Sequence, residues 1–479
     1  MAKDKTFVEN ITPQDEDFSR WYTDVIMQAK LVDYSDVKGC MVIREYGYGI
    51  WELIQKEMDA RFKATGHKNA YFPMLIPESL LKKEAEHVEG FAPEVAWVTQ
   101  GGSEPLAERL CIRPTSETII CSMYSRWVQS YRDLPLLLNQ WANVVRWEKT
   151  TRPFLRTSEF LWQEGHTVHA TQQEAEEETE KMLGVYREFA ENVLAIPVVV
   201  GRKSEKEKFA GALHTYTMEA LMQDGRALQM GTSHNLGQNF AKGFDIQFLD
   251  SDGQLKYVWQ TSWGTSTRMI GGLIMVHGDE RGLKLPPKVA PVQCVIVPVA
   301  AHKEGVLDKA REISGVLVKA GIRAELDDRE QSPGWKFNEW ELKGVPVRLE
   351  IGPRDIEKGE AVLARRDTHE KTSAPIADIQ GSVAALLDAI QKNMLEQARS
   401  FRDSHTFTAK NWDEFMQGIE EGHGFVRAMW CEETECETAI KEKTGVTTRC
   451  MPFEQESLSG VCVHCGKPAK KLTYFAKAY

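Results

Sequence analysis

The sequence predicts a multidomain protein: a large α+β domain, a smaller α/β domain and a small α+β unit that carries cysteines. Three observations support this. The chain has 479 residues, whereas one hydrophobic core seldom grows beyond about 250 residues. The stretch GLKLPPKVAP (282–291) holds three prolines and reads as a boundary. Five of the nine cysteines lie in the last fifty residues. We therefore expect domains at 1–285, 286–400 and 401–479.

Composition excludes several classes of protein. Hydrophobic residues make up 42% and charged residues 27% of the chain, as in ordinary soluble proteins. There is no apolar run of the roughly 18 residues that a membrane helix needs, and the start MAKDKTFVEN lacks the apolar core of a signal peptide. We expect a cytoplasmic protein. A net charge of −11 argues against a surface that coats nucleic acid, so any RNA must be held locally.

The first 285 residues mix helix and strand signals. Apolar residues recur at helical spacing over 50–62 and 175–190. The second of these helices begins with the acidic run EAEEETE (174–180), which we interpret as a solvated face near a helix start, where negative charge suits the helix dipole. Residues 146–160, RWEKTTRPFLRTSEF, read as the turn region of a strand-turn-strand.

After the boundary, strands alternate with helices. CVIVPVA (294–300) predicts a buried strand, an amphipathic helix follows from 306 to Gly321, and further strands are expected at 322–326, 346–351 and 360–365. Helical segments lie between the first two of these and after Gln380. This alternation predicts a small sheet with parallel pairs that ends near residue 400.

The cysteines of the last unit form two close pairs. Cys431 and Cys436 are separated by four residues, and Cys462 and Cys465 by two. Four converging thiolates fit a closed, structural, tetrahedral Zn²⁺ site. The alternative is a set of reduced structural cysteines. Cys450 and His464 are left over, and either could replace one of the four ligands.

Three arginines, Arg146, Arg152 and Arg156, crowd the predicted hairpin beside Glu148. An exposed ladder of ion pairs is the ordinary explanation for charged strands. However, further polar stretches occur at 110–118, 228–240 and 263–287, and the chain has neither GxxxxGK[ST] nor a GxGxxG after a strand. If a nucleotide binds here, arginines rather than a glycine-rich loop hold it.

These stretches carry a resemblance. NVVRWE with FLRTSEF resembles motif 2 of the class II aminoacyl-tRNA synthetases, STRMIGGLIMVHGDERGL resembles motif 3, and NAYFPMLIP (69–77) resembles motif 1. RPTSET, FLWQEGHT, GTSHNLGQNF and WGTSTR together resemble the prolyl-tRNA synthetases in their compact form, which archaea and eukaryotes also have. The match spans essentially the whole chain. It implies an antiparallel-sheet catalytic domain, an α/β anticodon-binding domain and a zinc-binding C-terminal domain.

The resemblance implies a reaction of L-proline with ATP and Mg²⁺, followed by prolyl transfer to proline tRNA. Both reactants of the first step are anions, so the protein must align and neutralise them. In the family pattern Arg146 bridges the α-phosphate and the substrate carboxylate, Arg156 reaches the outer phosphates and Arg268 clamps ATP from the other side. We assign Arg152 no role beyond adding to the local positive electrostatic field. The remaining ATP-site candidates are Glu148 for the adenine amino group, Phe160 for ring stacking, Thr157 nearby, and Gln229, Thr232 and Ser266 around ATP and magnesium. For Phe160, a place in the core is an equal alternative.

For proline, Thr115 and Glu117 resemble the pair that binds the amine, although T-S-E is also how a helix begins. Trp162, His166 and His234 are candidates for the ring pocket and rest mainly on the resemblance. Alanine and cysteine are small enough to enter, because missing methylenes are worth only about 1–3 kcal/mol. Residues 168–258 are too few for the editing insertion of bacterial relatives, so we expect no cis-editing of alanyl-tRNA.

The anticodon candidates are Arg348, Glu350, Arg354 and Lys358, with a solvated mixed-charge face as the alternative. The family pattern also brings the carboxylate of Tyr479 near the catalytic domain, and motif 1 implies a homodimer. Two rival functions are activation of another small amino acid, such as cysteine, and a synthetase-like binding or regulatory protein without catalysis. The presence of Arg146, Glu148, Arg156 and Arg268 disfavours the second.

Overall fold

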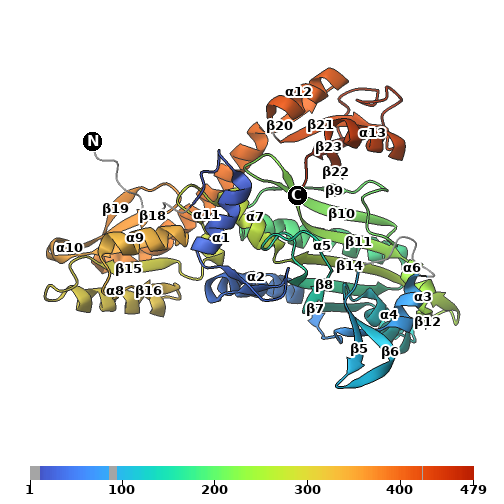
Figure 1. Cartoon of the computed structure of the whole chain (residues 1–479), viewed down its shortest axis with the longest axis horizontal. Helices are drawn as coiled ribbons and strands as arrows, with labels where there is room; N and C mark the ends of the chain where they lie inside the picture. Colours follow the sequence, from blue (N-terminus) through green and yellow to red (C-terminus); the bar gives the residue numbers. More distant parts are fainter. Residues whose placement is uncertain (1–10, 86–93, 423) are drawn as a thin grey trace.

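The computed structural model describes residues 11–85, 94–422 and 424–479, and its largest feature is an 11-stranded sheet (Figure 1). Its strands, in order across the sheet, are β20 (Thr406–Ala409), β21 (Phe425–Trp430), β23 (Lys471–Ala476), β22 (Thr447–Pro452), β9 (Val198–Arg202), β10 (His214–Leu221), β11 (Ala227–Gly237), β14 (Trp259–Ser266), β8 (Glu159–His169), β7 (Leu136–Val145) and β3 (Lys68–Asn69). Neighbours are antiparallel except for the outermost pair at each edge.

Helices cover one face of the central strands. They are α1 (Phe18–Gln28), α2 (Glu45–Ala64), α5 (Gln172–Asn192) and α7 (Arg268–His277), and their apolar stripes join sheet residues such as Met218 and Trp263 in one core cluster. Both helices expected from apolar spacing, α2 and α5, are present. Thr171 and Glu174 start α5 with reciprocal capping bonds. The opposite face carries many polar side chains, and at one end its residues Val168 and Leu236 join a separate apolar cluster.

The acidic run at the start of α5 is not wholly solvated, which corrects the interpretation of 174–180. Glu178 is buried, and its carboxylate lies 2.7 Å from His67 Nε2 and 2.9 Å from Lys181 Nζ. It lies three residues after the buried Ala175 and four before the buried Met182, so it belongs to the helix stripe that faces the core. Its charge is compensated by partners rather than by water.

A β-bulge shapes the polar face. In the β10–β11 pair, Met218 is opposite Gly231 but Glu219 is opposite Gln229, so Met230 is an extra residue. Because side chains alternate along a strand, the insertion re-aims the ones that follow. Gln229 and Thr232 therefore both face the cavity described below, while Met230 belongs to the core.

A second sheet has five strands in the order β16 (Ala324–Leu326), β15 (Cys294–Pro298), β17 (Val347–Ile351), β18 (Glu360–Arg365) and β19 (Lys371–Pro375). β15 is parallel to β16 and β17, as expected from the alternation of strands and helices. β19 was not predicted. The helices are α8 (Val306–Lys319), α9 (Pro333–Leu342), α10 (Pro353–Lys358) and α11 (Ile379–Ser404), and α11 leads toward the C-terminal part (Figure 1).

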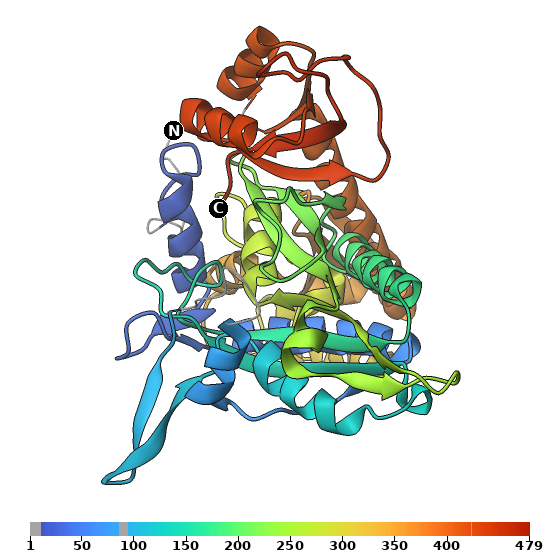
Figure 2. The same ribbon diagram turned by 90° about the vertical axis from the view of Figure 1, so that its right-hand side faces the viewer.

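The cysteine-bearing part adds α12 (Trp412–Gly422) and α13 (Thr434–Thr444). Its four strands are not a separate sheet: Met451 and Pro452 of β22 pair with Arg202 and Gly201 of β9. Figure 2 shows this part above the central strands, with the C-terminus returning toward them. The C-terminal strands therefore extend the main sheet.

Shorter elements complete the described chain. They are β1 (Val32–Tyr34) with β2 (Met41–Ile43), β4 (Leu75–Pro77), β5 (Trp97–Gly101) and β6 (Glu104–Ile112) in a three-stranded sheet, β12 (Gln247–Leu249) with β13 (Leu255–Tyr257), and the helices α3 (Glu78–Ala85), α4 (Glu117–Trp127) and α6 (Asn239–Phe244). Three single 3₁₀ turns lie at Tyr131–Asp133, Pro287–Val289 and Ile376–Asp378. Among the described helices, none is long and apolar enough to cross a membrane.

Candidate active site

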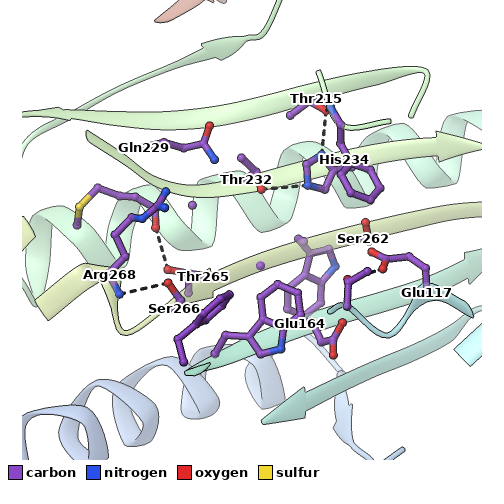
Figure 3. A pocket seen from close by; sticks show the side chains of 18 of the residues that line it. Glu117, Glu164, Thr215, Gln229, Thr232, His234, Ser262, Thr265, Ser266 and Arg268 are labelled. Atoms are coloured by element: carbon purple, nitrogen blue, oxygen red, sulfur yellow. Dashed lines mark hydrogen bonds between the residues drawn. The ribbon is translucent and has the colours of Figure 1, made fainter. Parts of the chain in front are cut away.

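The polar face of the main sheet holds a cavity of about 490 Å³. Strands β8, β14, β11 and β10 supply its floor. Figure 3 shows Arg268 and Gln229 toward one end, and Glu117, Ser262 and His234 toward the other. The sequence candidates that line it are Thr115, Glu117, Arg146, Phe160, Trp162, His166, Gln229, Thr232, His234, Ser266 and Arg268. Segments far apart in the sequence thus meet in one site.

A second hollow of about 420 Å³ adjoins the first. Arg146, Phe160, Ser266 and Arg268 line both. The second hollow adds the remaining hairpin candidates, Glu148, Arg156 and Thr157, together with Arg152 and Tyr479. All candidates for the ATP site therefore border two connected cavities.

The three candidate arginines differ in how they are held. Arg146 follows β7, and its Nε donates to the carbonyl of Pro114 at 3.0 Å. Arg268 is the first residue of α7, and its Nε donates to the carbonyl of Leu155 at 3.2 Å. Arg156 donates to the Glu148 carboxylate at 2.8 Å and keeps 66% of its side chain exposed. The ion-pair explanation of the hairpin thus applies to Arg156 and Glu148 but not to Arg146.

Charge is concentrated at this end of the cavity. The surrounding walls lower the pKa of Arg146, an effect that Glu117, Glu164 and Glu148 oppose. Burial also lowers the pKa of Arg268, and the positive charge of Arg146 adds to the effect. A guanidinium nevertheless remains charged in proteins. Two such cations facing one cavity favour an anionic ligand.

Phe160 is half-buried and borders both cavities, so the core alternative for this residue does not hold. Its ring lies 5.5 Å from the Arg146 guanidinium carbon, and the Trp162 ring lies 5.4 Å from the same atom. Both aromatic faces therefore flank the arginine, and a planar ligand ring can lie beside Phe160.

The other end of the cavity is acidic. Thr115 Oγ1 donates to the Glu117 carboxylate, and both residues are buried. α4 begins at Glu117, and its N-cap Ser116 makes no capping bond with its side chain. Ser116 Oγ instead donates to Glu164. The T-S-E sequence therefore supplies the buried carboxylate of Glu117, and its Ser116 holds the second buried carboxylate, Glu164, at the same end of the cavity.

Glu164 and His166 form a buried pair, with His166 Nε2 2.9 Å from the carboxylate. Burial alone would raise the pKa of Glu164, but His166, Ser116 and Gln140 hold it below its usual value. Burial likewise opposes a charge on His166, yet the hydrogen bond and charge of Glu164 raise the pKa of the histidine. His166 is thus bonded to Glu164 rather than being an isolated core histidine.

His234 has the opposite character. Its Nδ1 lies 2.9 Å from Thr215 Oγ1 and its Nε2 lies 3.0 Å from Thr232 Oγ1 (Figure 3). Burial, helped by the charge of His166, lowers the pKa of His234 to about 3. The ring is therefore neutral at physiological pH and contributes a polar edge without charge.

Several lining residues were not predicted. Glu164 lies between Trp162 and His166 on the same face of β8, so strand alternation alone could have identified it. The same reasoning applies to Ser262 on β14. Glu207 and Phe209 come from the loop between β9 and β10, and no pattern in the sequence marks that loop.

The four cysteine candidates converge. The Sγ atoms of Cys431, Cys436, Cys462 and Cys465 all lie within 4.8 Å of one another. Cys436 and Cys462 are 3.6 Å apart, as are Cys431 and Cys465, far more than the roughly 2.05 Å of a disulfide. A tetrahedron with zinc–sulfur bonds of about 2.3 Å has edges of roughly 3.8 Å. The four thiols therefore fit a tetrahedral metal ion.

Cys450 and His464, the two alternative ligand candidates, differ in their distance from the cysteine cluster. Cys450 is buried in β22, where burial raises the pKa of its thiol to about 12, and it is outside the cluster. His464 Nδ1 lies 3.5 Å from Cys436 Sγ, and its Nε2 lies 3.0 Å from Lys443 Nζ. The geometry keeps the four predicted cysteines as the candidate ligands.

Of the four anticodon candidates, the structure brings Arg348 and Glu350 together and leaves Arg354 and Lys358 apart from the hollow that Arg348 lines. Arg348 donates to Glu350 at 2.9 Å and lines a hollow of about 240 Å³. Arg354 and Lys358 lie exposed on α10 and do not line it. Sequence reasoning missed most of the lining, which includes Phe337, Trp340, Arg365, Arg366, His369 and Lys371. Arg365, Arg366 and Lys371 lie within the single stretch 365–371, where Asp367 and Glu370 interrupt the basic residues.

Tyr479 reaches the second hollow. Its hydroxyl donates to Asp224 at 2.6 Å, and its backbone N–H donates to the carbonyl of Ala227 at 3.1 Å. Its ring lies 5.6 Å from the guanidinium carbons of both Arg152 and Arg226. The last residue of the chain is therefore fixed beside the arginine-lined cavity.

Comparisons with known proteins agree along the chain. Residues 97–277 match the family model "tRNA synthetase class II core domain (G, H, P, S and T)", residues 293–392 match "Anticodon binding domain", and residues 412–479 match "Prolyl-tRNA synthetase, C-terminal". A proline–tRNA ligase of Alkaliphilus oremlandii is 66% identical over 478 residues, 100% of this chain and 99% of that protein. Those of Acetoanaerobium sticklandii and Clostridium novyi are 65% and 62% identical, also over at least 99% of both chains.

Proposed function

This chain belongs to the prolyl-tRNA synthetases of class II, and on that premise we propose that it is a proline–tRNA ligase, which activates L-proline with ATP and esterifies proline tRNA. One observation carries the proposal: a single cavity joins an arginine-lined end that suits a triphosphate to a carboxylate-lined end that suits an amine. Full-length relatives with this activity support the choice of substrate.

In the first step a proline carboxylate oxygen attacks the α-phosphorus of ATP, the bond from that phosphorus to the bridging oxygen breaks, and pyrophosphate leaves. No proton moves and no covalent enzyme intermediate is needed. The barrier comes largely from bringing two anions together, so fixed cations lower it. In the second step a hydroxyl oxygen of the terminal ribose of tRNA attacks the prolyl carbonyl carbon and gives its proton to the departing phosphate, the bond from that carbon to the phosphate oxygen breaks, and AMP leaves.

We assign Arg146 to the α-phosphate and the proline carboxylate. Its Nε is occupied by Pro114, and among the described residues the guanidinium makes no other hydrogen bond, so its terminal nitrogens remain for the substrates. Arg268 lies across the same cavity, and Arg156 borders the adjoining hollow, where the outer phosphates would extend. The planar fork of arginine pairs bidentately with such oxyanions.

For the adenine ring we propose stacking on Phe160, with Thr157 beside it. Glu148 uses Oε2 to accept from Arg156, which leaves Oε1 for the exocyclic amine. The oxygen donors near the phosphates are the side chains of Gln229, Thr232 and Ser266. Hard oxygen ligands suit Mg²⁺, which keeps several waters and would screen the phosphate charge when it is bound with ATP.

For proline we propose that Glu117 and Thr115 receive the cationic secondary amine. Trp162 and the neutral His234 would flank the ring, and His166 would hold Glu164 in place. Such a pocket excludes larger side chains by size. It admits alanine and cysteine with a penalty of only about 1–3 kcal/mol for missing contacts.

We propose that the chain does not edit in cis. Residues 168–258 are taken up by α5, β9, β10, β11, α6, β12 and β13 of the described structure. Alanyl-tRNA should therefore stay intact in the presence of the purified protein. Release of alanine faster than in buffer would reject this proposal.

We propose that Cys431, Cys436, Cys462 and Cys465 bind one structural Zn²⁺. The inter-sulfur distances of 3.6 Å support a four-thiolate site, which is closed and leaves no coordination position for catalysis. Free thiols at this spacing also suit a reducing compartment, which supports the cytoplasm as the place of the reaction.

For the anticodon we propose the hollow beside Arg348. It combines the Phe337 ring with cations of Arg365 and Lys371, and unpaired RNA bases bind by stacking on aromatic rings and by polar contacts to their edges. Glu350 would position Arg348. Arg354 and Lys358, which are exposed on α10, would contact the RNA backbone.

We further propose the domain boundaries given above, 1–285, 286–400 and 401–479, and a homodimer. Three apolar side chains within the motif 1 stretch, Tyr71, Met74 and Leu75, are exposed. Neighbouring exposed apolar groups are typical of protein interfaces. Sedimentation of the purified chain at the mass of two copies would support the dimer.

Proline-dependent exchange of labelled pyrophosphate into ATP tests the proposed function. We expect exchange with proline, weaker exchange with alanine and cysteine, and charging of tRNA that carries the proline anticodon. Exchange that prefers cysteine would support the rival substrate, and no exchange with any amino acid would support a binding protein without catalysis.

A further inference from the structure

The loop between β9 and β10 forms part of the amino-acid end of the cavity. Its residues Glu207 and Phe209 line the pocket, and the Phe209 ring lies 4.7 Å from the His234 ring. The backbone N–H of Phe209 donates to Thr215 Oγ1 at 2.9 Å, and Thr215 is also the partner of His234 Nδ1. This end of the loop is therefore tied to the pocket wall.

The other end of the loop is tied to the C-terminal part of the chain. Ser204 is buried, and its hydroxyl donates to Glu437 Oε1 at 2.9 Å. Ser204 Oγ also accepts the backbone N–H of Glu207 at 3.2 Å. One hydroxyl thus links Glu437 to the backbone of a pocket-lining residue. A second link runs from Lys206 Nζ to Thr438 Oγ1 at 2.8 Å.

Glu437 is well placed to act as an anchor. It is buried on α13, directly after the cysteine candidate Cys436, and its Oε1 also accepts the hydroxyl of Thr448 in β22. The bond between Ser204 and Glu437 joins residues 233 positions apart. The cysteine cluster is therefore connected to the pocket loop through the peptide bond from Cys436 to Glu437 and the hydrogen bond from Glu437 to Ser204.

A buried ion-pair network fixes the start of the loop beside this link. Lys203 Nζ donates to Glu219 Oε1 at 2.9 Å, and Arg449 Nη2 donates to Glu219 Oε2 at 2.8 Å. All three side chains are buried. Separating one partner from a buried charge cluster is costly. Lys203, the residue before Ser204, is therefore held in place.

We propose that Ser204 and Glu437 are positioning residues that hold the loop 204–209 against the amino acid, so that the C-terminal part sets the affinity for the amino acid and not for ATP. This inference rests on the proposed function. Its selectivity follows from the geometry: Glu207 and Phe209 lie at the His234 end, whereas the nucleotide end is built from Arg146 and Arg268 on other elements.

A double-mutant cycle on the full-length protein tests the inference. Ser204→Ala removes all three hydrogen bonds of the hydroxyl, with Glu437, Glu207 and Thr448, and Glu437→Gln removes the anchor carboxylate at nearly constant volume. KM for proline and for ATP are measured separately by pyrophosphate exchange, and metal content is measured to show that it is unchanged. Glu442→Gln is the matched control, because Glu442 is exposed on the same helix.

We expect Ser204→Ala to raise KM for proline about three- to tenfold, the effect of one lost hydrogen bond between neutral groups, such as the bond from the Glu207 backbone N–H. KM for ATP and the Glu442→Gln variant should stay within about twofold. The double variant should be no worse than Ser204→Ala alone, because coupled residues are not additive. If Ser204→Ala fails to fold, Glu437→Gln provides the test by itself. It should raise KM for proline, by less than is expected for Ser204→Ala.

Three outcomes would overturn the inference: a folded Ser204→Ala variant with an unchanged KM for proline, an equal rise in KM for ATP, or fold-changes that simply multiply in the double variant. Each of these leaves the proposed function intact. A wild-type chain without proline-dependent exchange would instead overturn the proposed function, and the inference with it.

Discussion

Replacing Arg146 by lysine should separate charge from geometry at the proposed α-phosphate site. Lysine keeps the positive charge but loses the planar fork and the anchor that Nε makes to the Pro114 carbonyl at 3.0 Å. One hydrogen bond to a charged group is worth about 1.5–3 kcal/mol. Loss of one such bond in the transition state corresponds to a fall in kcat/KM of about 10- to 150-fold.

The assay is proline-dependent pyrophosphate exchange with ATP and proline varied in turn. The kcat/KM of Arg146→Ala should fall further, by about a thousandfold, because this substitution also removes the positive charge from a site that stabilises a developing oxyanion. Arg187→Lys is the control, since Arg187 is exposed on α5 and makes only a surface ion pair, with its Nε 3.5 Å from the Glu191 carboxylate. If Arg146→Lys kept the wild-type kcat/KM, the proposed role of the planar Arg146 guanidinium would be refuted.

Four further predictions follow from other parts of the molecule. Cys462→Ser, or chelation of the wild type, should remove one zinc per chain by metal analysis and lower the first melting transition by roughly 10 °C; an unchanged melt would reject a structural metal. The pKa of His234 is lowered to about 3 from an ordinary 6.5, so the unfolded chain binds a proton first as the pH falls below 6.5. This histidine should therefore cost about 2 kcal/mol of stability between pH 7.5 and pH 5, and His234→Gln should show a shallower fall of the melting temperature over that range. Phe337→Ala should raise KM for tRNA about tenfold through lost stacking without changing pyrophosphate exchange in the absence of tRNA; a change in exchange alone would remove the anticodon assignment. Deletion of residues 478–479 removes the Tyr479 contacts with Asp224 and two arginines and should reduce proline activation about tenfold, whereas an unchanged rate would dismiss any role for the terminus.

Much of the site follows from patterns that are local in the sequence. The hairpin of β7 and β8 pairs continuously from Val145 and Glu159 outward, so its arginines had to meet near the turn. Alternation on β8 sets Trp162 and His166 on one face, and it also predicts Glu164. The two cysteine pairs were readable because a metal site needs four ligands at short spacing.

Other features depend on contacts that no local pattern encodes. The bulge at Met230 appears only when β11 is paired with β10. The continuation of the main sheet into β22 joins Met451 to Arg202 across about half the chain, so sequence reasoning treated the C-terminal part as separate. Glu178 was misread because its run of acidic neighbours hid its place on the buried stripe of α5.

In the proposed mechanism three guanidinium groups converge on one triphosphate so that a carboxylate can approach it. A crystal structure of the protein with ATP and proline bound tests this most directly. We predict that Arg146, Arg156 and Arg268 each place a nitrogen about 3 Å from a phosphate oxygen, with Arg146 also contacting the proline carboxylate. ATP bound elsewhere, or phosphates held without these arginines, would contradict it.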